Sequence, residues 1–160
     1  MLKEKDLLLM SFFRKNSRMP LTHISRKTNI PVSTIFDKLK EYESKLIEKH
    51  TTLINFRKLG FDIKVSILLK VENAEKYTLQ DYLQKDERVN SIFKINNGYD
   101  FLIEAIFRDI KEMNEFLEGL EQFSIIEKRE FFVLEDIKRE DFLTMRTPFL
   151  LRENTLFGTK

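Results

Sequence analysis

Cysteine and tryptophan are absent from this chain of 160 residues, which also holds only 4 glycines, 3 prolines and 2 histidines. Without cysteine there is no disulfide and no thiolate chemistry, which fits a protein of a reducing compartment. His23 and His50 are too isolated to suggest a metal site. No apolar run approaches the roughly 20 residues of a membrane span, and residues 1–6 do not resemble a signal peptide. We therefore expect a cytoplasmic protein that does not associate with a membrane.

The motifs of common catalytic sites are missing as well. The sequence has no glycine-rich phosphate loop, no carboxylate pair at a recognised spacing, and no Ser-His-Asp arrangement that can be read from it. We therefore expect a protein that is not an enzyme and that has no catalytic residue, no cofactor and no metal.

Charge is distributed unevenly along the chain, although the net charge is only +2. Residues 1–50 hold 11 lysines and arginines against 6 acidic residues, a net charge of +5. The remaining residues hold 17 against 20, a net charge of −3. A basic first third attached to a mildly acidic remainder indicates a polyanion-binding module, unless the split is chance scatter.

The segment from Leu21 to Ile47 is typical of a helix-turn-helix. Asn29 tolerates a left-handed backbone and Pro31 cannot donate a helical hydrogen bond, so a turn is expected between two short helices. Ser33 or Thr34 is predicted to cap the second helix. Its apolar residues recur at helical spacing and leave a polar, cation-bearing face outward, which is the face that a helix-turn-helix places in the major groove of DNA.

Candidate DNA contacts lie on this face and on the preceding helix. Short hydroxyls at a helix start can approach base edges or phosphates, and cationic side chains attract phosphates. For Phe36 two interpretations remain open: contact with a thymine methyl or a sugar, or packing against the first helix of the chain. The predicted contacts are Arg26, Lys27, Ser33, Thr34, Phe36, Lys38 and Lys40; the alternative is a solvated helix surface.

The flanking segments complete a winged domain. Residues 5–15 have a thick apolar helical face, so the first 43 residues predict three helices. Residues 46–55 alternate apolar and polar side chains with a β-branched bias, which predicts a wing and a connecting strand.

A different pattern follows from residue 61. Alternating or apolar runs predict strands over residues 61–71, 89–95 and 100–107 and within 124–137, and amphipathic patterns predict helices over 73–86 and 109–123. Asn97-Gly98 predicts a tight hairpin turn. This order is βαββαβ, a ferredoxin-like α+β sandwich in which two helices cover one face of the sheet. The other face is apolar enough to require a partner, so we expect oligomers.

The predicted fold is therefore α+β, with an N-terminal winged helix-turn-helix and a C-terminal ferredoxin-like βαββαβ domain. We expect the DNA-binding domain over residues 1–50, a connecting strand or hinge over 51–60, a ligand-sensing and oligomerisation domain over 61–140, and a tail over 141–160. The tail is too apolar for a purely solvated end. We therefore expect it to pack on its own subunit or a neighbouring one.

The chain resembles the Lrp/AsnC family of leucine-responsive, or feast/famine, transcription regulators over about residues 1–140. The resemblance rests on the helix-turn-helix at Leu21–Ile47, on TTLINFRKLGF at residues 51–61 and on NGYDFLI at residues 97–103. The last segment is similar to the family's Gly-x-Tyr-Asp turn at Gly98, Tyr99 and Asp100. The family implies double-stranded DNA as a partner, homodimers that assemble into tetramers or octamers, and small effectors, usually amino acids, bound between dimers near that turn.

By this resemblance, the implied effector residues are Asn97, Gly98, Tyr99, Asp100, Lys128 and Glu130. Lys128 and Glu130 stand where the final strand of the family commonly carries threonines, which suggests a different ligand or a contact between dimers. A turn alone also explains Asn97-Gly98. Two other functions stay open: a sensing module that no longer reads DNA, and an enzyme similar to siroheme decarboxylases. The second needs a basic pocket lined by His or Arg, and residues 51–160 contain no histidine.

Overall fold

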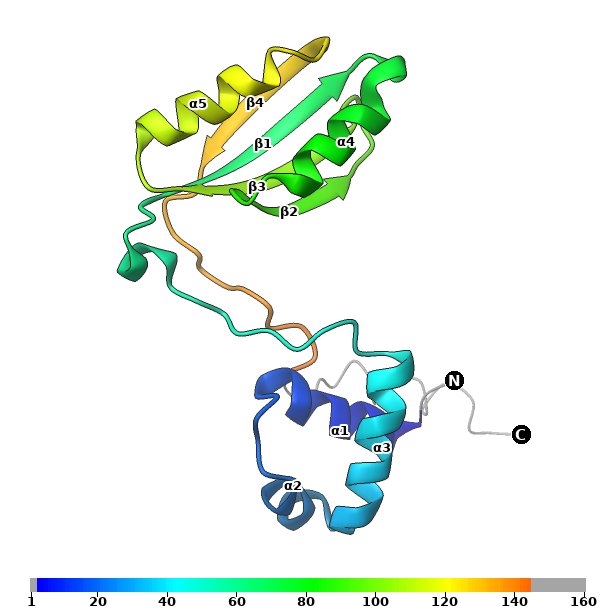
Figure 1. The fold of residues 1–160 in the computed structure, drawn as a ribbon. Helices are drawn as coiled ribbons and strands as arrows, with labels where there is room; N and C mark the ends of the chain where they lie inside the picture. Colours follow the sequence, from blue (N-terminus) through cyan, green and yellow to red (C-terminus); the bar gives the residue numbers. More distant parts are fainter. Residues whose placement is uncertain (1–2, 145–160) are drawn as a thin grey trace, which may run out of the picture. The chain divides into compact units, whose positions relative to one another are not determined.

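The computed structural model describes residues 3–144. These residues divide into two compact units, one formed by residues up to Thr52 together with residues from Lys138 onward, and one formed by Leu53–Ile137. The described residues of the first unit form three helices, which Figure 1 labels. They are α1 (Glu4–Lys15), α2 (Leu21–Thr28) and α3 (Val32–Lys45).

Helices α2 and α3 form the helix-turn-helix that the sequence predicts. Asn29 ends α2 with a left-handed backbone (φ 56°), and its N–H donates to the Ser25 carbonyl at 2.8 Å. The cap expected at Ser33 or Thr34 is wrong, because α3 begins at Val32 and Pro31 occupies the N-cap position. Proline fits there because the N–H that it lacks has no partner in the first turn of a helix.

A small apolar core holds the three helices together. Its buried side chains are Leu9 and Phe13 of α1, Ile24 of α2, and Ile35 and Tyr42 of α3. Tyr42 is nearly inaccessible, and Ile24 and Ile35 are fully so. Because these residues come from all three helices, the core fixes α3 with one face inward and the opposite face free.

The strand expected over residues 46–55 is wrong. No strand forms there, and a 3-10 helix, η1 (Phe56–Leu59), follows instead. Leu53 and Ile54 are both exposed. An alternating pattern produces a strand only where a neighbouring strand completes the hydrogen-bond ladder, and none of the described strands pairs with residues 46–55.

The second unit contains a four-stranded antiparallel sheet in the order β2-β3-β1-β4. The order of elements along the chain is βαββαβ, which confirms the predicted fold. The long elements are β1 (Ile63–Val71), α4 (Lys76–Lys85), β2 (Val89–Lys94), β3 (Phe101–Phe107), α5 (Ile110–Leu120) and β4 (Ile125–Phe132), with a short 3-10 helix, η2 (Asn73–Glu75), before α4.

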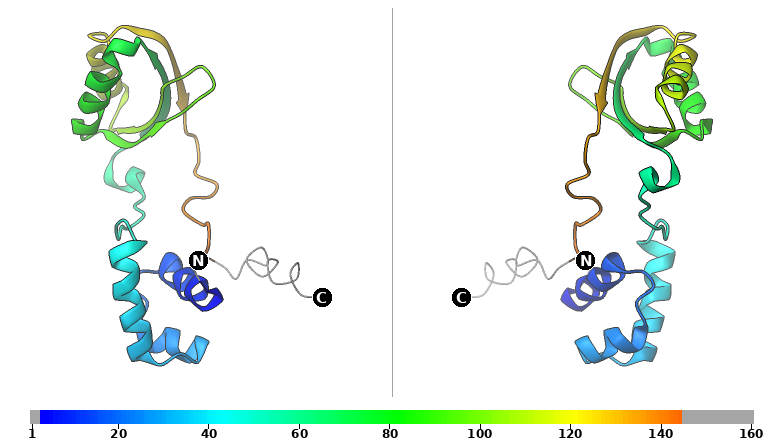
Figure 2. Two further views of the ribbon diagram at one scale, coloured as in Figure 1. Left: turned by 90° about the vertical axis from the view of Figure 1, so that its right-hand side faces the viewer. Right: turned by 90° about the vertical axis from the view of Figure 1, so that its left-hand side faces the viewer.

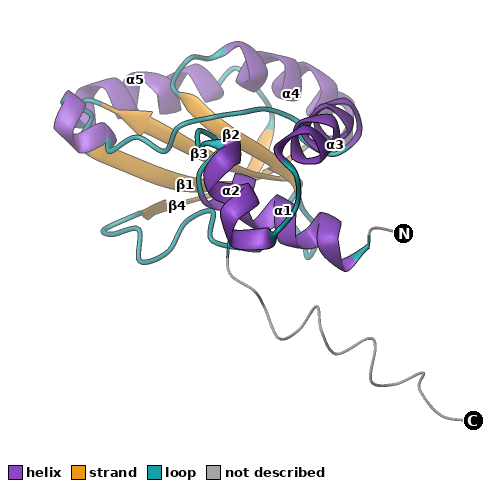
Figure 3. Cartoon of the chain, turned by 90° about the horizontal axis from the view of Figure 1, so that it is seen from below, coloured by secondary structure: helices purple, strands orange, loops and turns teal. Residues whose placement is uncertain are grey.

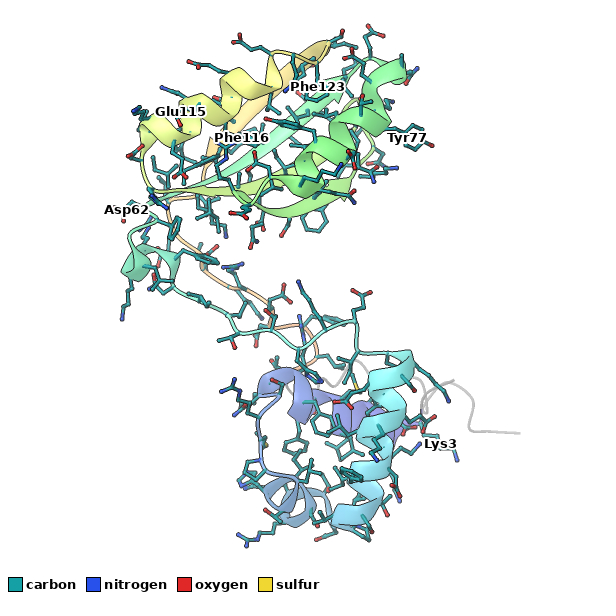
Figure 4. The ribbon with its side chains drawn as sticks, viewed as in Figure 1. Lys3, Asp62, Tyr77, Glu115, Phe116 and Phe123 are labelled. Atoms are coloured by element: carbon teal, nitrogen blue, oxygen red, sulfur yellow. The ribbon has the colours of Figure 1, made fainter. Side chains whose placement is uncertain are left out.

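Both helices of this unit cover the same face of the sheet, as Figures 2 and 3 show. Buried residues alternate along β1 at Val65, Ile67, Leu69 and Val71, and they pack with buried residues of both helices. Phe116 of α5 is fully buried, and in Figure 4 it points toward the sheet. The opposite face of the sheet is left without a covering element among the described residues of this unit.

The structure adds two details to the sequence prediction. Tyr77 does not join the apolar face of α4, since 81% of its surface is exposed and it points away from the sheet in Figure 4. The last strand ends at Phe132, before Val133 and Leu134. Of the tail over residues 141–160, the structure describes only 141–144, so most of that prediction lies outside the described residues. Among residues 3–144, no helix has the length and apolarity needed to cross a membrane.

Candidate nucleic-acid interface and effector site

The outward face of α3 presents four of the predicted DNA contacts together. Ser33, Thr34, Phe36 and Lys40 are all exposed, whereas Ile35 between them is fully buried. The core positions this face because the buried residues recur on one side of the helix. The result is a polar surface with one large aromatic side chain in it.

Phe36 does not pack against α1, which was one of its two predicted roles. It belongs to neither apolar core, and 46% of its surface is exposed. The ammonium of Lys40, one helical turn later, lies 4.5 Å from the centre of its ring. Among the described residues, Lys40 forms no ion pair within 4.0 Å, so its charge is available to a phosphate.

Lys38 differs from the other predicted contacts. Its ammonium lies 3.1 Å from the carboxylate of Asp6 on α1 and 3.1 Å from that of Glu41. The hydrogen bonds to Glu41 and then to Asp6 raise the pKa of Lys38. Lys38 therefore lies on the flank of α3 that faces α1, away from the side that carries Lys40.

Asp6 is the centre of this contact between α1 and α3. Its carboxylate accepts a hydrogen bond from the Tyr42 hydroxyl at 2.7 Å and another from the backbone N–H of Lys3 at 3.0 Å. The Tyr42 hydrogen bond is the main cause that lowers the pKa of Asp6. Burial, followed by the hydrogen bond to Asp6, raises the pKa of Tyr42. This network helps to fix the orientation of α3 relative to α1.

Two further predicted contacts, Arg26 and Lys27, lie exposed in the last turn of α2. A cation near a helix C-terminus also interacts favourably with the helix dipole, so these two charges have a structural use as well. Arg14 of α1 pairs with Glu140, and its Nε donates to the carbonyl of Phe142 at 3.3 Å. Of the predicted cationic contacts, Arg26, Lys27 and Lys40 are therefore the exposed ones, whereas Lys38 is paired with Asp6 and Glu41.

The hairpin turn predicted at Asn97-Gly98 forms at the end of the sheet. Asn97 (φ 64°) and Gly98 (φ 92°) both have left-handed backbones, as a type I′ hairpin turn requires. The N–H of Ile95 donates to the carbonyl of Asp100 at 3.1 Å and closes the turn. Tyr99 and Asp100 then lead into β3.

Both carboxylate oxygens of Asp100 have partners inside the protein. One accepts from the backbone N–H of Val71 at 3.0 Å, and the other lies 2.5 Å from the ammonium of Lys76 at the start of α4. Burial raises the pKa of Asp100, but these two bonds outweigh it and the pKa falls below its ordinary value. Asp100 therefore ties the turn to β1 and α4.

A shallow cavity of about 320 Å³ adjoins this turn. Basic, acidic and amide side chains all line it, together with the backbone of the turn. Its lining includes Lys70, Glu72, Asn73, Lys76, Asn96, Asn97, Gly98, Tyr99, Asp100 and Ile126. Such a lining can hold a small zwitterionic or polar molecule through several charge-assisted hydrogen bonds.

Lys128 and Glu130 do not join the turn. The register pairs Lys128 with Leu69 and Glu130 with Ile67, so both point to the face of the sheet that the helices cover. There they lie 3.1 Å from each other. The predicted grouping of these two residues with Tyr99 and Asp100 is therefore not found.

The residues of β4 that do reach the turn are Glu127 and Arg129, which the sequence reasoning missed. The Tyr99 hydroxyl donates to Glu127 at 2.5 Å, and Arg129 Nε donates to the same oxygen at 2.9 Å. Both bonds lower the pKa of Glu127, and the bond from Tyr99 has the larger effect. Within residues 3–144, no group of three or more acidic or histidine side chains is placed to hold a metal ion.

Comparison with known proteins identifies the second unit. The family model described as the Lrp/AsnC ligand binding domain matches residues 64–142. The chain belongs to the Lrp/AsnC family. An uncharacterised HTH-type transcriptional regulator of Pyrococcus abyssi is 27% identical over 143 residues, 89% of this chain and 97% of its own length. The regulator FL11 of the same organism is 29% identical over 118 residues, 73% of this chain and 78% of its own.

Solved structures show the same fold as this Lrp/AsnC chain. LrpC of B. subtilis has a TM-score of 0.78 at 16% identity and covers 86% of this chain and 98% of its own. A Neisseria meningitidis transcriptional regulator solved with L-Met has a TM-score of 0.79 at 17% identity. The match covers 87% of this chain and 94% of that regulator. With its helix-turn-helix and the family's ligand binding domain, the chain is a DNA-binding transcription regulator.

Proposed function

We propose that this Lrp/AsnC protein reads a specific operator sequence by placing the outward face of α3 in the major groove. Ser33, Thr34 and Phe36 meet base edges, and Lys40 reaches a flanking phosphate. The observation that carries the proposal is the surface of α3 itself. This surface is exposed, and the buried core holds the backbone of α3 in place. The ammonium of Lys40 forms no ion pair with the described residues.

The remaining predicted contacts have different roles in this proposal. Arg26 and Lys27 bind phosphates beside the groove, because both are exposed at the end of α2. Lys38 reaches DNA only by leaving Asp6 and Glu41, so its contribution is to hold α3 against α1.

The regulator acts as a homodimer or a larger assembly of dimers. The uncovered face of the sheet carries apolar side chains that include Leu68 and Leu102, with Phe93 and Phe131 about half exposed. A face of this kind requires a partner, and a second copy of the same sheet supplies one. Two α3 helices in a dimer then read two half-sites about one helical turn apart.

A small effector, an amino acid or a related molecule, binds in the cavity beside the turn at Asn97–Asp100. Lys70 offers a cation to a carboxylate, and Glu72 offers an anion to an ammonium. The neighbour solved with L-Met supports an amino acid as the class of ligand. Asp100 keeps the turn in place, and Glu127 with Arg129 fixes the position of Tyr99.

We propose further that the protein is not an enzyme and acts in the cytoplasm, as its regulator relatives indicate. Residues 51–60 serve as the connection between its two parts. A sensing module without DNA reading is the alternative, and it predicts stabilisation by a ligand without DNA binding.

The test is to measure binding of the purified protein to the DNA just upstream of its own gene, at two salt concentrations, with a scrambled duplex as control. The proposal predicts tight binding to the first duplex, and affinity that falls steeply as salt rises. Equally weak binding to both duplexes contradicts it and favours the sensing alternative.

A further inference from the structure

Phe36 is an unusual residue to find on the surface of the first unit, which contains the helices α1, α2 and α3. Of the aromatic side chains of α1 and α3, Phe13 and Tyr42 are buried and Phe12 packs against the core, whereas Phe36 lies half exposed on the polar face of α3. No apolar partner from the described part of the core covers it. Exposed apolar area of this size is unfavourable in water, so it gains free energy when another molecule covers it.

Lys40 adds a second, independent feature to the same spot. Its ammonium stands 4.5 Å from the centre of the Phe36 ring, although Asp37 and Glu41 lie on the same helix and offer carboxylates. A cation–π contact leaves the hydrogen-bond donors of the ammonium free. The ring and the cation therefore form a pair with an apolar part and a part that can bind an anion.

The major groove of DNA contains a matching pair of groups. Thymine places a C5-methyl group in the groove, and apolar side chains distinguish it from the other bases by contact with that methyl. The phosphates that border the groove lie a few ångströms away and attract lysine. An aromatic ring beside a methyl group and a lysine beside a phosphate suit this pair of residues.

We infer that Phe36 reads the methyl group of a thymine in each half-site and that Lys40, held over its ring, binds the neighbouring phosphate. This inference rests on the proposed function, because it assumes that α3 enters the major groove. It goes beyond that function by assigning one base to one residue. Contact of the ring with a sugar is the competing interpretation, and it confers no preference for thymine.

The test uses duplexes that the full-length protein selects from a randomised pool. Each conserved thymine of the selected site is replaced in turn by deoxyuridine, which lacks only the C5-methyl group. At the contacted position, loss of one buried methyl lowers the affinity about fourfold per half-site. The protein binds a duplex with 5-methylcytosine·guanine at this base pair more tightly than one with cytosine·guanine, because 5-methylcytosine restores the methyl group at the same place.

Variants then connect the methyl to Phe36. The Phe36→Ala variant binds the thymine and deoxyuridine duplexes equally, whereas Lys40→Ala keeps the preference and lowers the slope of affinity against salt. Tyr77→Ala is a matched control, because Tyr77 is also exposed and Lys94 lies 5.7 Å from the centre of its ring, but on the other unit. This control keeps the full preference of the unsubstituted protein.

The outcomes separate this inference from the proposed function. Specific binding with no effect of deoxyuridine at any position overturns the inference and leaves the DNA-reading function intact. A deoxyuridine effect that persists in Phe36→Ala overturns it too, since another residue then reads the methyl. Failure to select any sequence overturns the proposed function first. The deoxyuridine scan needs only the unsubstituted protein, so this part of the test does not depend on how any variant folds.

Discussion

The hydroxyl of Tyr42 donates a 2.7 Å hydrogen bond to the carboxylate of Asp6, 36 residues earlier in the chain. Both residues are buried, and only 8% of the surface of Asp6 is exposed. This bond links α1 to α3 beside the core and helps to set the direction in which α3 faces. The stability of the helical unit should therefore depend on it.

Replacement of Tyr42 by Phe removes the hydroxyl and keeps the ring. We expect the free energy of unfolding of the helical unit to fall by about 1 to 3 kcal/mol, because the Asp6 carboxylate loses a buried partner. Thermal or denaturant unfolding followed by circular dichroism measures the change. Tyr77→Phe is the control and should unfold as the unsubstituted protein does, since Tyr77 is 81% exposed. Equal unfolding of both variants would contradict the structural role of the bond.

The same carboxylate predicts a pH dependence. The pKa of Asp6 is lowered in the folded protein, chiefly by the Tyr42 hydrogen bond. Its contribution to stability is therefore complete above the unfolded pKa of about 3.9 and is lost as the pH falls through the lower folded pKa. The stability difference between the unsubstituted protein and Asp6→Asn should be largest above about pH 5 and shrink toward pH 2. A difference that stays constant over this range would sink the prediction.

Asp100 should stabilise the sheet unit even without an effector. Its two oxygens bind the Val71 N–H and Lys76, so Asp100→Ala should lower the free energy of unfolding by about 1 to 3 kcal/mol. The matched control is Asp81→Ala, which breaks the exposed Asp81–Lys85 pair of α4 and should cost about 0.5 kcal/mol or less. Amide exchange at Val71 should quicken in the first variant alone. If Asp100→Ala instead weakens only effector binding, Asp100 is a ligand contact.

The uncovered face of the sheet should carry the dimer. Phe131 pairs with Ser66 in the register and lies on that face, about half exposed. A buried carboxylate without a partner is strongly unfavourable, so Phe131→Glu should convert the dimer to a monomer. Light scattering after size-exclusion chromatography measures the mass. Tyr77→Glu, on the helical side, should keep the mass of the unsubstituted protein; a dimer in both variants would place the interface elsewhere.

The sequence was sufficient for the features that depend on local chemistry. Asn29 and the Asn97-Gly98 pair adopt left-handed backbones as predicted, because the side chains that tolerate such backbones are few. The βαββαβ order followed from hydrophobic period, turn signals and length, which are properties of consecutive residues.

Features that depend on distant partners could not be read in this way. The family resemblance groups Lys128 and Glu130 with the turn, but the register of β4 places Glu127 and Arg129 there, since a shift of one residue exchanges the two faces of a strand. Residues 46–55 have a strand-like pattern without a strand partner. The pairing of Lys38 with Asp6 links positions 32 residues apart, and no local sequence pattern predicts a contact between them.

The outward face of α3 is tested most directly by the ratio of affinities for a selected duplex and its scrambled form. The unsubstituted protein should prefer the selected duplex by about a thousandfold or more. In a variant with Ser33→Ala, Thr34→Ala and Phe36→Ala, this ratio should approach one, while weak, salt-sensitive binding to both duplexes remains. A variant with Tyr77→Ala, Thr78→Ala and Gln84→Ala, all exposed on α4, should keep the ratio. An undiminished ratio in the α3 variant would contradict the central claim that α3 reads the operator.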